Sequence, residues 1–177
     1  MNIEPQANPE RTQLGKLIKD FPAVMLTTQD DDGLLVGRPM TPLEMDASGA
    51  LWFFTDSTSE KSQHMESANL GFADSDNSTY VSISGYGTLS YDRAHIERLW
   101  TPFAKPWFPD GSSSPNLALL KFTPASAEYW DASSSKMIRM FAMAASIVAA
   151  KPIGLGEHNT LSNLSGNSHP SSATHTL

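Results

Sequence analysis

Two basic and two hydroxyl-bearing residues between positions 38 and 61 could together bind an anion. Arg38 ends one apolar run, Thr55 ends the next, and Ser59 and Lys61 follow at the start of an expected helix. A turn at 46–49 brings the ends of the two runs together. A helix N-terminus, an ammonium and a guanidinium fork suit a phosphate dianion. The alternative is that both cations are ordinary solvated charges and that Ser59 only caps the helix.

Short β-rich runs separated by turn signals must position these residues. Asp32-Gly33 between two apolar runs is typical of a hairpin. Helical spacing and capping residues, among them Asn8 and Asp92, predict helices over 9–20, 57–68, 92–100 and 135–150. The expected strands cover 23–28, 34–38, 50–55, 70–74, 80–90, 117–122 and 127–131. Many short strands with few helices predict a mainly β protein, a small β-barrel with flanking helices.

Composition excludes several classes of function. The chain has 177 residues and a net charge of −7, which disfavours binding along a nucleic acid. Cysteine is absent, so disulfides, thiol nucleophiles and Cys-ligated metals are excluded. No apolar run is long enough to span a membrane and no secretory signal is present, so we expect a cytoplasmic protein. The histidines after residue 150 match no metal motif, and we expect no metal.

Several short motifs follow one another in a fixed order along the chain. They are Gly37-Arg-Pro-Met40, Gly49-Ala-Leu-Trp-Phe-Phe-Thr55, Ser59-Glu-Lys61, Leu99-Trp100, Trp107-Phe-Pro-Asp-Gly111 and Glu128-Tyr-Trp-Asp131. From 14 to 131 this order resembles the pyridoxamine 5′-phosphate oxidase-like flavoproteins, in particular the general stress protein branch. The resemblance implies a six-stranded antiparallel split β-barrel that binds FMN as a homodimer, with the flavin at the interface. It gives residues 8–150 as the FMN-binding domain, and the polar composition of 151–177 predicts a flexible C-terminal tail.

The same resemblance assigns nine residues to the flavin. They are Arg38, Pro39, Met40, Phe54, Thr55, Ser59, Lys61, Trp100 and Trp107. Arg38 would contact the phosphate or the ring edge, and residues 39–40 would run along the isoalloxazine ring. Residues 54–55 would line the ribityl chain and phosphate, while Ser59 and Lys61 would hold the phosphate. The region of the two tryptophans would cover the flavin from the second subunit.

Departures from the family pattern bear on the reaction. Residues 40–43 contain no lysine, Glu60 replaces a cation, and the C-terminal Arg-x-His element of the true oxidases has no counterpart. Pyridoxamine phosphate oxidation is therefore disfavoured. We expect a stress-related, FMN-dependent oxidoreductase whose small-molecule electron donor or acceptor is unknown. The alternatives are a flavin-storing or redox-sensing module without dedicated turnover and a cofactor-free interaction protein. No side chain stands out as a catalyst. The bound cofactor is FAD instead of FMN if the loop at 101–115 leaves room for an adenosine.

Overall fold

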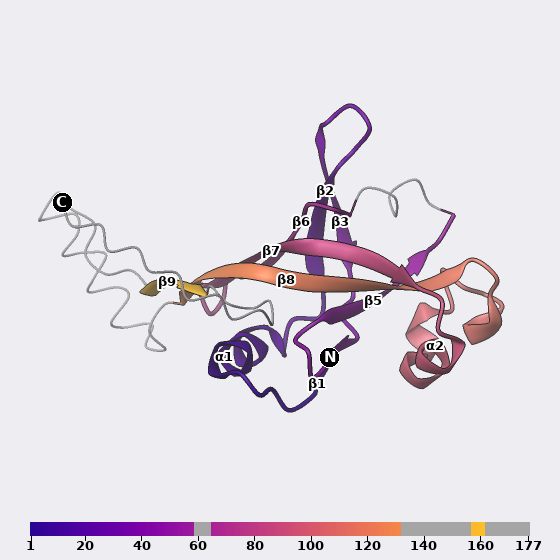
Figure 1. The fold of residues 1–177 in the computed structure, drawn as a ribbon, viewed down its shortest axis with the longest axis horizontal. Helices are drawn as coiled ribbons and strands as arrows, with labels where there is room; N and C mark the ends of the chain where they lie inside the picture. Colours follow the sequence, from indigo (N-terminus) through magenta and orange to yellow (C-terminus); the bar gives the residue numbers. More distant parts are fainter. Residues whose placement is uncertain (59–64, 132–156, 162–177) are drawn as a thin grey trace, which may run out of the picture.

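The computed structural model describes residues 1–58, 65–131 and 157–161, and this part of the chain is mainly β (Figure 1). Two α-helices are present there, α1 (Pro9–Ile18) and α2 (Arg93–Leu99), with short 3-10 turns at Pro102–Ala104 and Gly111–Ser113. The strands are β1 (Asn2–Ile3), β2 (Val24–Gln29), β3 (Leu35–Met40), β4 (Glu44–Met45), β5 (Leu51–Asp56), β6 (Ala68–Asp74), β7 (Thr79–Ser90), β8 (Leu117–Asp131) and β9 (Glu157–Leu161).

All the described strands belong to one sheet. Its order is β1-β4-β5-β8-β7-β6-β2-β3, and β9 pairs with β8 outside this path. The pairs are antiparallel except for β1 with β4. Six of the described strands have six residues or more, which matches the predicted count, and the shorter β1, β4 and β9 bring the described total to nine. Two-residue strands such as β1 and β4 are too short to show an alternating pattern in a sequence.

The hairpin of β2 and β3 projects from the rest of the molecule (Figure 1). At its tip, the Asp30 carboxylate accepts hydrogen bonds from the amides of Asp32 and Leu34, and Gly33 has a φ of 78°. This confirms the predicted Asp-Gly turn. The return strand was expected over 34–38, before Pro39, but β3 continues to Met40. An edge strand tolerates proline, because its outer N–H groups have no strand partner.

Strand β8 merges two predicted strands. Its fifteen residues pair with β7 along most of their length, and the register shifts between Ser84 and Gly85. A side chain at Gly85 would place its Cβ 2.2 Å from the carbonyl oxygen of Thr123, so the backbones approach closely there. Pro124 sits beside this irregularity, which explains how a strand passes through a proline that the sequence reads as a break.

The predicted helices have different outcomes. Asn8 caps α1 by accepting from the amides of Glu10 and Arg11, and Asp92 caps α2 in the same way. The helix expected over 57–68 is wrong at its described C-terminal end, because Ala68 already begins β6. Residues 59–64 and the helix expected over 135–150 lie outside the described residues.

The range predicted as a flexible tail contains one described element. Residues 157–161 form β9, which pairs with the last residues of β8 from Ala127 to Asp131. The rest of 151–177 lies outside the described residues, so the proposed tail is otherwise still a prediction.

Two groups of buried side chains hold these elements together. The first lies between α1 and the sheet and comprises Leu14, Ile18, Val24, Leu26, Met45, Leu51, Phe53, Met65, Ala68, Leu70, Phe72, Val81, Ile83, Leu120, Phe122 and Ala127. The second lies beside α2 and comprises Trp52, Ile96, Ala104, Phe108, Leu117 and Leu119. Strand β5 contributes to both groups, so it links the sheet to the α2 region.

In the described part of the chain, neither helix has the length and hydropathy needed to cross a bilayer.

Candidate functional site

A cavity of about 390 Å³ opens between strands β3 and β5 and the segment that follows α2. Its lining is Arg38, Pro39, Met40, Thr41, Leu43, Phe54, Thr55, Asp56, Thr101, Phe103, Ala104, Trp107 and Phe108. The lining is largely apolar, with one basic and one acidic side chain. A cavity of this size and character is typical of a small-molecule site. We call residues 38–40 and 54–56 the strand wall, and the lining residues of 101–108 the loop wall.

Arg38 brings a positive charge into the strand wall. It pairs with Leu26 across the β2–β3 hairpin and is half-buried. Its Nη1 donates to Oγ1 of Thr28 at 3.2 Å, and its Nη2 lies 3.9 Å from the sulfur of Met65. Burial lowers the pKa of Arg38, but a guanidinium remains charged at neutral pH. The cavity therefore carries a partly desolvated cation that favours an anionic ligand or an electron-rich ring edge.

Asp56 ends β5 on the same wall. One carboxylate oxygen accepts from the hydroxyl and amide of Thr58 at 2.6 and 2.8 Å, and the other accepts from Nδ2 of Asn116 at 2.7 Å. The hydroxyl and amide of Thr58, followed by Asn116, hold the pKa of Asp56 below its usual range. Asp56 is thus an ionised residue that fixes the start of the segment leading to Ser59.

The loop wall is built from short local turns. The amide of Ala104 donates to the carbonyl of Thr101, and the amides of Trp107 and Phe108 donate to the carbonyl of Ala104. Ala104 and Phe108 are buried, while Phe103 and Trp107 are 89% and 73% exposed. The buried side chains of Ala104 and Phe108 therefore anchor the loop wall, and the exposed rings of Phe103 and Trp107 lie at the rim of the cavity.

Phe54 joins the two walls. Its ring lies 5.7 Å from that of Trp100 and 6.5 Å from that of Phe108, measured between centroids. Tilted and edge-on aromatic pairs of this kind are favourable beyond their buried area. Phe54 and Phe108 thus supply part of the apolar lining of the cavity.

The structure places seven of the nine predicted site residues. Six line the cavity: Arg38, Pro39, Met40, Phe54, Thr55 and Trp107. Trp100 lies behind the lining, half-buried against Phe54. Ser59 and Lys61 lie outside the described residues, so the convergence of two cations on one phosphate stays a prediction.

Sequence reasoning missed several lining residues. They are Thr41, Leu43, Asp56, Thr101, Phe103, Ala104 and Phe108. Asp56 directly follows Thr55 at the strand end, and that position is a signal that could have identified it. Thr41 and Leu43 follow Met40 within three residues, which is a similar signal. The remaining four depend on how the 101–108 segment folds back onto β5, which no local pattern specifies. Among the described residues, no three acidic or histidine side chains group as a metal site, and the expectation of no metal remains a prediction.

Comparison with known proteins places this geometry in a family. The model of a family described as pyridoxamine 5′-phosphate oxidase like matches residues 9–153. The protein bli-3 of Neurospora crassa is 25% identical over 141 residues, covering 72% of this chain and 68% of its own.

Solved structures agree on the fold. A protein of Jannaschia sp. CCS1, provisionally named general stress protein 26, has a TM-score of 0.67 at 25% identity and covers 85% of this chain and 96% of its own. The general stress FMN/FAD binding protein of Xanthomonas citri has a TM-score of 0.58 at 32% identity, covering 71% and 90%. The predicted split-barrel fold class is confirmed. The chain belongs to the pyridoxamine 5′-phosphate oxidase-like family.

Proposed function

We propose that the cavity binds a flavin, with FMN as the first candidate and FAD as the longer alternative. The observation that carries this proposal is a half-buried guanidinium, Arg38, at one side of a largely apolar cavity bounded by aromatic rings. A flavin mononucleotide combines a flat apolar ring with a phosphate, so its chemistry matches both features. The Xanthomonas citri relative, whose name states FMN/FAD binding, supports the same choice.

The residues that would hold the flavin come from both strands of the strand wall. Arg38 would contact the phosphate or the ring edge, and residues 39–40 would lie along the ring. Phe54 and Thr55 would line the ribityl chain, and Ser59 and Lys61 would complete the phosphate site. A bound flavin supplies electron-transfer chemistry, and the protein supplies binding, orientation and charge.

A second subunit would complete this site. Phe103 and Trp107 stand at the rim with most of their surface exposed, although large aromatic side chains favour burial. We expect a homodimer with the flavin at its interface, in which these rings become covered. We also expect a cytoplasmic location and no nucleic-acid or membrane partner.

The proposed activity is a stress-related, flavin-dependent oxidoreduction with a small-molecule electron donor or acceptor. A flavin-storing or redox-sensing role is the second candidate, and one observation favours it. Among the described lining residues there is no histidine, and both carboxylate oxygens of Asp56 already accept hydrogen bonds. Proton transfer during turnover would therefore have to use the ligand, water or another group.

Removal of the Arg38 charge tests the proposed site. Charge-assisted hydrogen bonds contribute roughly 1.5–3 kcal/mol, so Arg38→Met should weaken FMN binding by about tenfold or more. Fluorescence titration measures the Kd, and Lys16→Met, which removes an exposed cation on α1, is the matched control. Riboflavin lacks the phosphate and therefore distinguishes the two proposed roles of Arg38. If Arg38 contacts only the phosphate, Arg38→Met should leave the Kd for riboflavin unchanged. Equal FMN affinity in Arg38→Met and in the control would refute this role of Arg38.

Rapid reoxidation kinetics separate the two candidate functions. An oxidoreductase should have an acceptor that reoxidises the reduced flavin faster than oxygen does. If no acceptor exceeds oxygen, the storage or sensing role is favoured.

A further inference from the structure

A buried carboxylate ties α2 to β4. The side chain of Glu44 is 0% exposed, and both of its oxygens face the guanidinium of Arg98. Nη1 of Arg98 donates to Oε2 at 2.6 Å and Nη2 donates to Oε1 at 2.9 Å. Nε2 of His95 lies 3.4 Å from Oε1. A two-pronged contact fixes both the distance and the orientation of α2 relative to β4.

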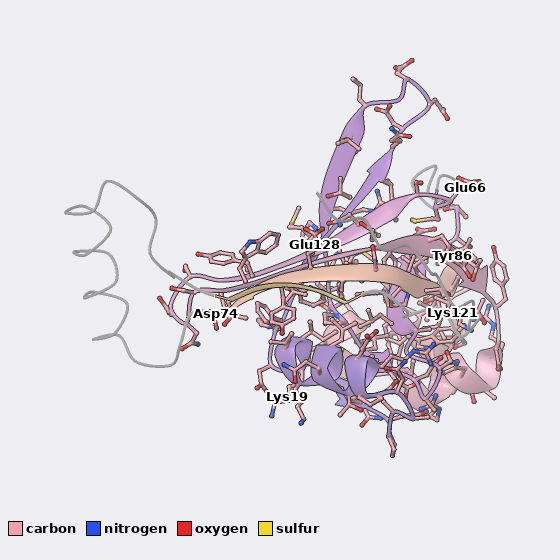
Figure 2. All side chains as sticks on the ribbon, turned by 60° about the vertical axis from the view of Figure 1, so that its left-hand side comes forward. Lys19, Glu66, Asp74, Tyr86, Lys121 and Glu128 are labelled. Atoms are coloured by element: carbon pink, nitrogen blue, oxygen red, sulfur yellow. The ribbon has the colours of Figure 1, made fainter. Side chains whose placement is uncertain are left out.

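Aromatic contacts extend this cluster to β5 and β8. The ring of His95 lies 4.4 Å from that of Trp52, and Nζ of Lys121 lies 5.5 Å from the Trp52 ring. Nε1 of Trp52 also donates to the Asp46 carboxylate at 2.8 Å. Figure 2 shows Lys121 at the end of the molecule that carries α2, opposite Asp74. The cluster thus connects α2 with three strands, and not with β4 alone.

Helix α2 leads directly into the loop wall. Only Trp100 separates its last residue, Leu99, from Thr101 at the cavity. A seven-residue helix is too short to be stable by itself, so tertiary contacts must hold it. These contacts include the packing of Ile96 with Ala104 and Phe108 in the second buried group and the binding of Arg98 to Glu44. On the strand side, Glu44 directly follows Leu43, which lines the cavity.

We propose that Glu44, Arg98 and His95 are positioning residues that set the place of the loop wall against the strand wall. This proposal rests on the proposed flavin site, because its consequence for function is the affinity for the ring. Removing the charged partner of a buried carboxylate strongly destabilises a fold. Here that partner, Arg98, is on the helix that leads to the loop wall. The three residues act on the ligand only through the placement of 101–108.

Arg98→Met is the main test. Hydrogen exchange is measured by mass spectrometry on the full-length protein, and FMN and riboflavin affinities are measured by fluorescence titration. Amides in 101–108 should exchange at least about tenfold faster, while β7 and β8 stay unchanged. The Kd values for FMN and riboflavin should rise by the same factor, about tenfold, because the ring contact is affected and the phosphate contact is not.

Two further variants complete the design. Arg98→Lys keeps the charge but not the fork, so its exchange rates and affinities should fall between those of wild type and Arg98→Met. It also serves as the test if Arg98→Met does not fold. Glu97→Gln changes an exposed charge on the same helix and should match the wild type.

The outcomes distinguish this proposal from the proposed function. Unchanged exchange over 101–108 in Arg98→Met, or equally faster exchange throughout β7 and β8, would overturn the positioning role. If the wild type binds neither flavin, the proposed function fails, while the exchange data still test the placement of the loop wall.

Discussion

The two walls of the cavity are held by different forces. The strand wall belongs to the sheet: β5 pairs with β4 and β8, and its residue Phe53 is fully buried. The loop wall has short turns of its own and reaches the rest of the molecule through Ala104, Phe108 and the α2 contacts. One wall is thus stabilised by long ladders of backbone hydrogen bonds, and the other by a few side chains.

This difference indicates where the molecule can adapt to a ligand. Segments with few buried contacts open at a lower free energy than core strands, and binding elements are commonly of this kind. The strand wall provides a fixed cation, Arg38, whereas the loop wall provides aromatic surface that local movement can adjust. The following variants test this contrast.

The largest expected effect comes from the core beneath the strand wall. Phe53→Ala should lower the free energy of unfolding by about 4 kcal/mol, because the side chain is 0% exposed and leaves a cavity. Urea denaturation measures the change, and both walls should be lost in the same transition. Tyr91→Ala, at an exposed site, should change the free energy by no more than about 0.5 kcal/mol. A loss below about 1.5 kcal/mol for Phe53→Ala would contradict the strand wall's dependence on the core.

The next effect concerns the anchor of the loop wall. Phe108→Ala should cost about 3 kcal/mol and weaken flavin binding, because Phe108 is 6% exposed and packs on Phe54. Its matched control is Lys105→Ala in the same loop, an exposed position outside the cavity lining, where the expected change is within about 0.5 kcal/mol. Denaturation and flavin titration check both. Equal losses of stability in the two variants would show that Phe108 does not anchor the loop wall.

A smaller effect depends on pH. Hydrogen bonds from Arg98 lower the pKa of Glu44, against the opposing effect of burial. A carboxylate with a lowered folded-state pKa stabilises the fold above its unfolded pKa, and this stability is lost as the pH falls through the folded-state pKa. Glu44→Gln should therefore cost about 1.5 kcal/mol near pH 7, a modest value because Arg98 is 53% exposed and screened by solvent.

The pH dependence is the sharper part of that prediction. The difference in unfolding free energy between wild type and Glu44→Gln should shrink as the pH falls through the lowered folded-state pKa of Glu44, because the side chain then becomes protonated. Denaturation at several pH values measures it. A difference that stays constant between pH 7 and pH 3 would show that the charge of Glu44 does not stabilise the α2 contact.

The smallest effect lies outside both walls. Gly33 has a φ of 78° with open space around it, so Gly33→Ala meets backbone strain without a steric clash. The expected cost is about 1 kcal/mol, and flavin affinity should stay unchanged. Thermal denaturation and flavin titration check this, and a changed affinity would mean that the hairpin tip communicates with the cavity.

Local chemistry explains which parts of the fold could be predicted from the sequence. The caps Asn8 and Asp92 and the turn at Gly33 each act within a few residues, and all three were expected. The continuity of β8 through Pro124 was missed, because it depends on close approach at Gly85 in another strand. Long-range contacts of this kind leave no periodic signal.

In the candidate site, too, the sequence predicted residues in local motifs but not contacts between distant segments. Arg38, Phe54 and Thr55 were assigned because they stand in motifs, and the structure brings them to one cavity. The ion pair of Glu44 and Arg98 went unnoticed, because these residues are 54 positions apart in sequence and neither stands in a motif. Their contact follows from the packing of α2 against β4, which only the folded chain specifies.

The most direct test of the central claim is hydrogen exchange of the wild-type protein with and without saturating FMN. If the flavin binds between the two walls, exchange should slow in peptides covering 38–40 and 54–56 and slow most in 101–108, where local opening is easiest. No slowing in either wall, or slowing confined to another part of the sheet, would contradict flavin binding in this cavity.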